Sequence, residues 1–391
     1  MIWSGLLARH PWAALRAEQQ PGWQAHPELD DIMTDLATRP ALVTPGEIAT
    51  LRGSLAAAAR AEALVLQVGD CAESLAETAA EHVTAKAGLL SGLAGQLASG
   101  SELPVVMVGR IGGQFAKPRS QATEIHQGAT LPAFRGHMIN SETRTAAARQ
   151  HDPRRMLASY DASARVLRTL RLIRGLDDRG PWSSHEALVI DYEAAAVRED
   201  PGSGAAYLGS THFPWIGERT RQPDGAHVHM LSAVGNPVAC KVGPTALADD
   251  ILQVCATLDP ERQPGRLALI ARMGADQVAA ALPPIAAAVR RAGHPVIWLT
   301  DPMHGNTRTT AAQVKTRYLS DILREIDGFR LALARLRLHP GGLHLEVATS
   351  PVTECVGGPV EHERAIHARY LTFCDPRLNP EQAHQVIESW R

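Results

Sequence analysis

The sequence lacks any long uninterrupted hydrophobic run, although 45% of its 391 residues are hydrophobic. No segment approaches the roughly 18 consecutive apolar residues of a membrane-spanning helix, which excludes that class of protein. The first twenty residues, MIWSGLLARHPWAALRAEQQ, lack the basic start of a secretory signal, and Arg9 and His10 interrupt their apolar run. The sequence therefore predicts a cytoplasmic protein with enough apolar residues for a large core.

An excess of either charge is also missing. The chain has 39 Lys and Arg residues against 41 Asp and Glu residues, and its formal net charge is -2. This balance argues against nucleic acid or an anionic membrane as the main partner. An anionic ligand would have to be bound by Arg and Lys side chains that the fold brings together locally.

Paired cysteines are absent as well. The five cysteines lie far apart and form no Cys-x-x-Cys motif; they are Cys71, Cys240, Cys255, Cys355 and Cys374. In a cytoplasmic chain, an odd number of isolated cysteines favours free thiols or a metal ligand over a disulfide framework.

Eight short apolar runs, each bounded by turn residues, recur along the chain. They span residues 64–69, 104–109, 187–192, 213–217, 237–243, 266–271, 295–300 and 342–348. Stretches with helical spacing separate most of them, which is typical of parallel strands covered by helices on both faces. Eight such units predict an α/β fold, a (β/α)8 TIM barrel. A doubly wound sheet is the alternative, but no Gly-x-Gly-x-x-Gly motif follows the first strand.

The pattern divides the chain into two parts. Residues 1–60 are predicted to form an N-terminal helical extension packed on the barrel, and residues 61–391 the catalytic barrel itself. The longest gap between predicted strands, residues 110–186, is expected to carry additional loops and helices.

Every predicted strand ends in a charged or metal-competent side chain, at the end of the barrel where folds of this type carry their chemistry. One set is basic and includes the segment KPRS; it consists of Arg110, Arg219, Lys241, Arg272, Lys117, Arg119 and Ser120. Guanidinium forks and ammonium groups that converge in a near-neutral protein predict a multiply charged anion, most simply one or two phosphates. The acids that follow other strands are Asp191, Glu193, Glu218 and Asp301.

A second set combines a thiol, an imidazole and carboxylates: Cys71, His304, Glu346 and Asp375. Together they predict a site for a divalent metal ion. Each residue also has a structural interpretation. Cys71 alone is more typical of a small buried hydrophobic residue, and Lys241 is equally suited to a Schiff base or a salt bridge.

Many segments carry a resemblance to a known family. They are QVGDCAES, VGRIGGQFAKPRS, DPRRMLASY, SHEAL, WIGERTRQPDGAHV, NPVACKVGPT, RMG, DPMHGNT, KTR, LHLEV, VTECVGG and CDPRLN. In these segments, in order and over essentially the whole chain, the sequence resembles the class II (plant-type) 3-deoxy-D-arabino-heptulosonate 7-phosphate (DAHP) synthases. The resemblance implies the barrel fold and a transferase that condenses phosphoenolpyruvate with erythrose 4-phosphate and releases phosphate, the first step of the shikimate pathway.

The resemblance also implies a role for each site residue. Cys71, His304, Glu346 and Asp375 would hold a divalent cation, Mn²⁺ or Co²⁺ first, with Fe²⁺ or Zn²⁺ as alternatives. Phosphoenolpyruvate would be bound by Arg110, Glu218, Arg219, Lys241 and Arg272, and the aldose phosphate by Lys117, Arg119 and Ser120. The catalytic residues would be Lys241, Glu218, His304 and Arg110. A homo-oligomer, in the simplest case a dimer, is expected.

Some segments depart from the family pattern. FRGHMINS carries His137 where an Asp is usual, which leaves an amino or imino form of erythrose 4-phosphate, or another aldose phosphate, as an alternative substrate. The chain is also short for the family, which favours a role in secondary metabolism. A Schiff-base aldolase using Lys241 and a non-catalytic phosphosugar-binding homologue are the remaining alternatives.

Overall fold

Eight parallel strands form one sheet in the computed structural model, which describes residues 10–126 and 128–390. Around the sheet the strands follow chain order: β1 (Leu64–Gly69), β2 (Val105–Arg110), β5 (Trp182–Ser183), β8 (Trp215–Ile216), β9 (Val238–Val242), β10 (Leu267–Ala271), β11 (Ile297–Thr300) and β14 (Pro340–Glu346). A parallel bridge between Glu186 and Trp215 joins the segment after β5 to β8. Since β5 and β8 are the two edge strands of the hydrogen-bonded sheet, this bridge brings its edges together, and the predicted (β/α)8 barrel is confirmed.

The third strand is not where the sequence predicted it. The apolar run 187–192 was expected to be a strand, but it leads into a short helix, α5 (Ile190–Ala195), and the strand is the preceding pair Trp182–Ser183. The run is apolar because α5 is buried on all sides, and burial alone does not distinguish a short strand from a short helix.

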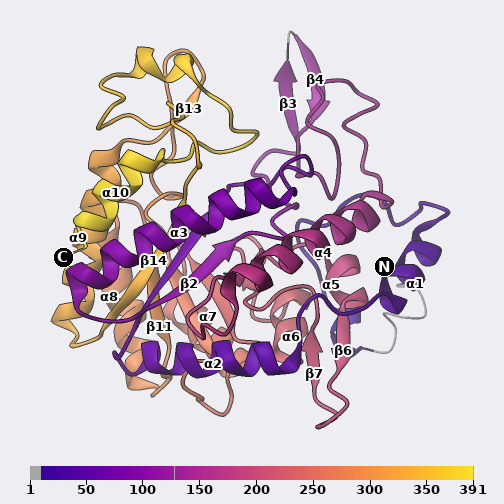
Figure 1. Cartoon of the computed structure of the whole chain (residues 1–391), viewed down its shortest axis with the longest axis horizontal. Coiled ribbons are helices and arrows are strands. Elements are labelled where there is room, and N and C mark those ends of the chain that lie inside the picture. The colour runs from indigo at the N-terminus through magenta and orange to yellow at the C-terminus, as the bar shows by residue number, and fades with distance from the viewer. Residues whose placement is uncertain (1–9, 127, 391) are drawn as a thin grey trace.

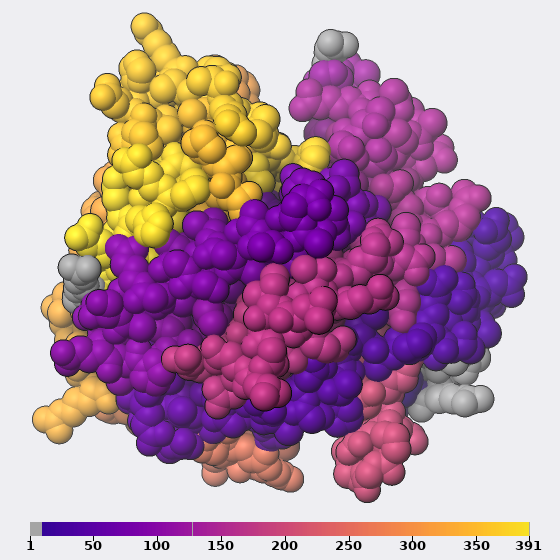
Figure 2. All heavy atoms as spheres, viewed as in Figure 1, coloured from indigo at the N-terminus to yellow at the C-terminus, as the bar shows by residue number. Residues whose placement is uncertain are grey.

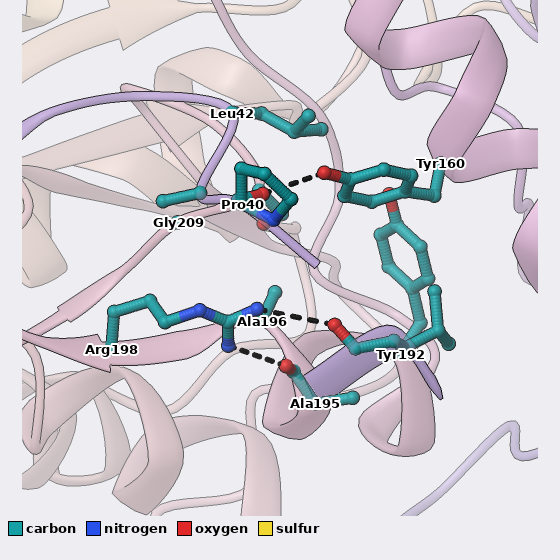
Figure 3. Close-up of a pocket in the computed structure, with 11 residues that line it drawn as sticks. Pro40, Leu42, Tyr160, Tyr192, Ala195, Ala196, Arg198 and Gly209 are labelled. Atoms are coloured by element: carbon teal, nitrogen blue, oxygen red, sulfur yellow. Dashed lines mark hydrogen bonds between the residues drawn. The ribbon is translucent and has the colours of Figure 1, made fainter. Parts of the chain in front are cut away.

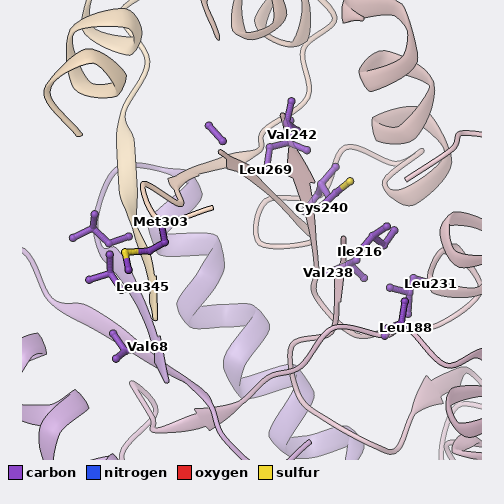
Figure 4. Packing of buried hydrophobic residues seen from close by; sticks show 14 of the residues in the cluster. Val68, Leu188, Ile216, Leu231, Val238, Cys240, Val242, Leu269, Met303 and Leu345 are labelled. Atoms are coloured by element: carbon purple, nitrogen blue, oxygen red, sulfur yellow. The ribbon is translucent and has the colours of Figure 1, made fainter. Parts of the chain in front are cut away.

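Helices surround the strands, as Figure 1 shows for α3, α4 and α7–α10. Their bounds are α3 (Ala80–Ser101), α4 (Arg155–Arg174), α6 (Ala226–Ser232), α7 (Ala248–Leu258), α8 (Val278–Arg291), α9 (Leu319–Arg335) and α10 (Pro380–Glu388). Figure 4 shows the layer between strands and helices, where Ile216, Val242 and Leu345 are fully buried. Burial of such side chains contributes about 1.5–3 kcal/mol each.

Helix α2 (Pro45–Ala59) closes the N-terminal end of the barrel. Thr44 caps this helix by accepting a hydrogen bond from the backbone N–H of Glu47, while the Glu47 carboxylate accepts from the backbone N–H of Thr44. Leu51 and Leu55 of α2 are fully buried in one cluster with side chains from the strands, including Leu299. The apolar face of α2 therefore closes the barrel interior at its N-terminal end.

The segment before α2 packs on the barrel wall. It contains a 3-10 helix, η2 (Pro11–Ala14), and α1 (Leu29–Thr38), and Trp12 and Trp23 belong to the same buried cluster as the strands. The described part of this segment is largely helical and packs on the barrel, and residues 1–9 lie outside the described residues. The division of the chain at residue 60 stays a prediction.

Three small hairpins interrupt the barrel repeat. They are β3 (Thr123–His126) with β4 (Ala129–Pro132), β6 (Val197–Glu199) with β7 (Ala206–Leu208), and β12 (Arg308–Thr309) with β13 (Lys315–Thr316). The longest predicted insertion holds the first hairpin and α4. Figure 1 shows the β3–β4 hairpin and β13 at one end of the molecule and α2 at the opposite end. Among the described residues, no helix is long and apolar enough to cross a membrane, and all five cysteines are free thiols.

Candidate active site

A cavity of about 280 Å³ opens at the C-terminal end of the barrel. Figure 2 shows a notch at this end of the molecule, between the β3–β4 hairpin and the C-terminal segment. The cavity is lined by Lys117, Pro118, Arg119, Ser120, Glu186, Gly217, Glu218, Arg219, Lys241, Arg272, His304, Thr307, Thr309, Lys315 and Asp375. Every residue predicted to bind a substrate lines it except Arg110, so the fold brings the predicted basic set together.

One wall of the cavity carries three basic side chains that were predicted to bind an anion: Arg219, Lys241 and Arg272. Lys241 Nζ is 2.8 Å from Asp301 Oδ2, and Arg272 Nη2 donates to the backbone oxygen of His304 at 2.9 Å. Burial lowers the pKa of Lys241, although the neighbouring Asp301 opposes this shift. Arg219 is exposed to solvent at the rim. The wall therefore offers a buried ammonium group and two guanidinium groups to an anion.

Arg110 lies beneath the cavity and is 1% exposed. Its Nη2 donates to Glu346 Oε1 at 3.0 Å, and its Nη1 lies 2.5 Å from Nε2 of His344. Arg110 therefore belongs to the layer of buried charged residues directly beneath the cavity, which is called the floor of the cavity below.

The four predicted metal ligands gather on the same floor. The ammonium group of Lys117 contacts Cys71 Sγ and lies 2.8 Å from Asp375 Oδ2 and 3.4 Å from Glu346 Oε1. His304 Nε2 is 3.2 Å from the same oxygen of Glu346. A thiol and two carboxylates thus surround the Lys117 ammonium group, and the imidazole of His304 contacts one of these carboxylates.

The charges around this point favour ionised carboxylates. Burial alone would raise the pKa of Glu346, but His304, Lys117 and other nearby cations hold it well below its usual range. Burial and the neighbouring Cys374 raise the pKa of the Cys71 thiol, so a strong positive charge is needed to stabilise its thiolate.

The donor set fits a divalent cation, because soft sulfur, imidazole nitrogen and carboxylate oxygen are all ligands of Mn²⁺, Co²⁺, Fe²⁺ and Zn²⁺. The Lys117 ammonium contacts three of the four groups, those of Cys71, Asp375 and Glu346. As the side chains lie, no three His, Cys, Asp or Glu residues within 10–126 and 128–390 are close enough to hold a metal. Binding would require Lys117 to move aside.

Glu186 is a cavity residue to which the sequence reasoning gave no role. It is buried, burial raises its pKa, and its Oε1 has no hydrogen-bond partner in the described residues. A Cβ on Gly217 would lie 2.0 Å from this oxygen, so glycine leaves room for the carboxyl group where it now lies. Glu186 is the glutamate of the segment SHEAL, which follows the true third strand, Trp182–Ser183. Because the third strand was predicted at 187–192, Asp191 and Glu193 were predicted to lie at its end instead.

Asp191 and Glu193 do not belong to the cavity. Asp191 Oδ2 accepts a hydrogen bond from Trp23 Nε1 at 2.7 Å, and Glu193 contacts His185 Nε2 at 2.8 Å and Ser210 Oγ at 2.6 Å. Both lie on α5 and connect parts of the barrel wall. The expectation that they end a catalytic strand is wrong.

Arg317 supports the floor and was not singled out from the sequence beyond the motif KTR. It is fully buried, and its Nη1 donates to Glu346 Oε2 at 2.7 Å while its Nε donates to Thr307 Oγ1 at 2.9 Å. Glu346 is therefore paired with Arg110 on one oxygen and with Arg317 on the other.

His137 is not a cavity residue. It is buried, its Nδ1 accepts from the backbone N–H of Leu75 at 3.2 Å, and its Nε2 lies 2.7 Å from Glu142 Oε2. Phe134 and Phe373 pack edge-on against its ring. This residue supports the surrounding wall and does not line the cavity.

A second hollow, close to 10 Å³, lies between α1, α4 and α5 (Figure 3). Tyr160 Oη donates to the backbone oxygen of Pro40 at 2.6 Å, and Arg198 Nη1 donates to that of Ala195 at 2.6 Å. Backbone oxygens pair with Tyr160 and Arg198, and the hollow is too small for a substrate, so the 280 Å³ cavity is the candidate active site.

Comparison with known proteins identifies relatives over nearly the full length. Residues 7–180 and 174–388 match the class-II DAHP synthetase family. The chain is 47% identical over 380 residues to a probable phospho-2-dehydro-3-deoxyheptonate aldolase of Pseudomonas fluorescens, covering 96% of this chain and 94% of that one. It is 41% identical over 438 aligned positions to the phospho-2-dehydro-3-deoxyheptonate aldolase of Streptomyces coelicolor, covering 98% and 97%.

A solved structure supports the fold. The phospho-2-dehydro-3-deoxyheptonate aldolase of Francisella tularensis superimposes with a TM-score of 0.52 over 93% of this chain and 97% of that chain. The two sequences are only 12% identical, so this likeness concerns the fold alone.

Proposed function

The chain belongs to the class-II DAHP synthetase family, and on this premise we propose that it condenses phosphoenolpyruvate with erythrose 4-phosphate to DAHP and inorganic phosphate. The observation that carries the proposal is one cavity lined by Lys241, Arg272 and the KPRS segment together with His304 and Asp375. Cys71 and Glu346 are buried next to it. Cations for two phosphorylated substrates and a set of ligands for one metal ion open onto the same end of the barrel.

The two substrates are assigned to opposite sides of the cavity. Arg219, Lys241 and Arg272 would neutralise the carboxylate and phosphate of phosphoenolpyruvate, and Arg110 beneath them would add a buried positive charge. Arg119, Ser120 and, once displaced from the acids, Lys117 would hold the phosphate of the aldose. Lys315, which now pairs with Asp375 Oδ1 at 2.9 Å, is close enough to join them.

Cys71, His304, Glu346 and Asp375 would hold the divalent cation, which when bound would polarise the aldehyde oxygen as a Lewis acid. Arg317 and Arg110 keep Glu346 ionised and in place for this role. Asp301 fixes the imidazole of His304, since its Oδ2 lies 2.7 Å from Nδ1 and leaves Nε2 directed at Glu346.

In the proposed reaction a bond forms between C3 of phosphoenolpyruvate and the aldehyde carbon, water adds at C2, and phosphate leaves by cleavage of the C2–O bond. Two carboxyl groups line the cavity where protons must move. Glu186 Oε1 is unpartnered and its pKa is raised by burial, which suits it to take a proton from the attacking water. Glu218, held by Arg221 Nη2 at 2.9 Å, would stabilise the positive character that develops at C2.

Erythrose 4-phosphate is the substrate we propose because His137, the residue that suggested an amino or imino analogue, does not line the cavity. We further propose a cytoplasmic homodimer that serves secondary metabolism. In the described residues, the segment between β2 and β5 carries one hairpin and one helix, and this short insertion supports a role in secondary metabolism.

The proposal is tested with protein stripped by a chelator and reloaded with Mn²⁺ or Co²⁺, following the loss of phosphoenolpyruvate absorbance with erythrose 4-phosphate as partner. We expect metal-dependent consumption with one phosphate released per phosphoenolpyruvate. Cys71→Ser should weaken metal binding and turnover, while Cys255→Ser on α7 should leave both unchanged. Consumption that survives the chelator and is trapped by borohydride would favour a Schiff base on Lys241, and absence of any turnover would favour a non-catalytic homologue.

A further inference from the structure

Two loops of the candidate active site touch each other backbone to backbone. The loop after β10 carries Arg272 and the loop after β11 carries His304. A Cβ built on Gly305 would lie 2.3 Å from the backbone nitrogen of Gly274, and one built on Gly274 would lie 3.0 Å from the backbone oxygen of Gly305. Only glycine on both sides permits this approach, so the two loops are packed as one unit.

Direct hydrogen bonds join the same two loops. Arg272 Nη2 donates to the backbone oxygen of His304 at 2.9 Å, and the backbone N–H of Ala275 donates to Asn306 Oδ1 at 2.9 Å. A shift of one loop therefore changes the place of the other. Arg272 is assigned to phosphoenolpyruvate and His304 to the metal ion, so the relative position of the loops sets the relative position of the two ligands.

Glu325 of α9 bridges the loops from behind. It is fully buried, its Oε1 accepts from the backbone N–H of Met273 at 2.7 Å, and its Oε2 accepts from Asn306 Nδ2 at 2.7 Å. No ion pair to Glu325 is present within the described part of the chain. Burial raises the pKa of its carboxyl group, but the donors that face both of its oxygens oppose this shift and favour the ionised form. Burial of a carboxyl group without a salt bridge costs free energy, and hydrogen bonds from neighbouring donors have to offset this cost.

The hydrogen-bond directions make Glu325 specific for this place. Both of its partners are donors, and Asn306 already uses its oxygen to accept from Ala275 while its Nδ2 also donates to the backbone oxygen of Pro302 at 2.8 Å. Asn306 therefore cannot rotate its amide without losing those bonds. Only a group with two acceptor oxygens satisfies Met273 and Asn306 together.

We propose that Glu325 is a positioning residue that sets the place of Arg272 relative to His304 and thereby the affinity of the site for phosphoenolpyruvate. This inference rests on the proposed function for its substrate. Glu325 touches neither substrate nor metal ligand and acts through the two loops. Lys117, Arg119 and Ser120 lie on a different element, the segment after β2, so their contacts to the aldose phosphate do not depend on Glu325.

The test uses Glu325→Gln, which keeps the shape of the side chain but turns one acceptor into a donor. A donor would then face either Met273 N–H or Asn306 Nδ2, and the loops would separate. We expect the KM for phosphoenolpyruvate to rise about tenfold, while the KM for erythrose 4-phosphate stays within about twofold. Asp327→Asn, an exposed acid on the same helix, is the matched control and should leave both constants unchanged.

Asn306→Ala tests the same link from the loop side in case Glu325→Gln does not fold. It should produce the same selective rise, and the double variant should be no worse than the more affected single variant because both remove one link. An equal rise in the KM values for both substrates would overturn the proposal. So would an unchanged KM for phosphoenolpyruvate in a variant that unfolds at the same temperature as the wild type.

Calorimetric titration with phosphoenolpyruvate alone separates this inference from the proposed function. If wild-type protein binds phosphoenolpyruvate but forms no DAHP, the function fails while a weaker affinity in Glu325→Gln still supports the positioning role. If wild-type protein is an active synthase and Glu325→Gln binds phosphoenolpyruvate equally well, the function stands and the positioning role fails.

Discussion

At the N-terminal end of the barrel, α2 covers the strands with leucine side chains, whereas at the C-terminal end the strands lead into buried charges. Leu51 and Leu55 are fully buried at the first end. At the second end, Glu346 is also fully buried, but it is surrounded by Arg110, Arg317 and the Lys117 ammonium. Equal burial thus has a different basis at each end: transfer of apolar surface in one case and mutual neutralisation of charge in the other.

This difference agrees with the general division of barrels into a stabilising N-terminal face and a reactive C-terminal face. The charged floor departs from it in one respect. Its ions are sequestered from water, so each one also depends on its partners for stability. The four substitutions below test how far the two ends differ.

Glu346→Gln should have the largest effect, because it acts on both properties. It removes a proposed metal ligand and leaves Arg110 and Arg317 without their shared counter-charge. We expect turnover to fall on the order of 10²–10³-fold and the free energy of unfolding to fall by about 3–5 kcal/mol.

Steady-state kinetics and urea unfolding would measure these changes, with exposed Glu381→Gln on α10 as the control. Lost turnover at unchanged stability would contradict the view that the charged floor also holds the barrel together.

Leu55→Ala addresses the opposite end. Loss of this fully buried side chain should lower the free energy of unfolding by about 3–4 kcal/mol, since the surrounding strands cannot close the space. The KM and kcat at the distant cavity should stay as in the wild type below the unfolding transition. Leu331→Ala, on an exposed face of α9, provides the control. A changed KM for either substrate would show that the two ends are coupled.

Asp191→Asn examines a residue that the sequence assigned to the reactive end and the structure assigns to the wall. Burial raises the pKa of Asp191 to about 6, so the folded state binds its proton more tightly than the unfolded chain does. Its contribution to stability is full below about pH 4 and is lost as the pH rises through 6.

Asparagine avoids this loss and still accepts the hydrogen bond from Trp23. We expect Asp191→Asn to gain about 2–3 kcal/mol in unfolding free energy at pH 8 and nothing near pH 4. Urea unfolding at both pH values measures the difference, with exposed Asp178→Asn as the reference. A tenfold loss of activity in Asp191→Asn would contradict this assignment and indicate that Asp191 takes part in the reaction.

Arg219→Ala should have the smallest effect. The side chain is exposed at the rim, so its removal leaves no buried charge behind and stability should not change. We expect a rise of about tenfold in the KM for phosphoenolpyruvate, close to 1.4 kcal/mol of binding. Arg168→Ala, exposed on α4, is the control. An unchanged KM would remove Arg219 from the proposed binding set.

The barrel could be predicted from the sequence because most of its strands are apolar runs buried on both faces. The third strand could not, since only Trp182 and Ser183 pair regularly with β2 and the longer apolar run beside them belongs to α5. That error displaced Glu186, a cavity residue, in favour of Asp191 and Glu193. Cys71 and Asp375 are separated by 303 intervening residues, and only their residue types and the resemblance to a family predicted that they lie at one site.

The sequence by itself determined seven of the eight barrel strands, the end of the barrel at which charges gather, and the family. Local hydrophobic pattern and motif order are sufficient for these. Only the tertiary structure decided that Lys117 lies among the proposed metal ligands, that His137 faces phenylalanine rings, and that Glu325 of α9 bridges the loops of Arg272 and His304. Those relations depend on distances between side chains far apart in the chain, which packing fixes and no local pattern encodes.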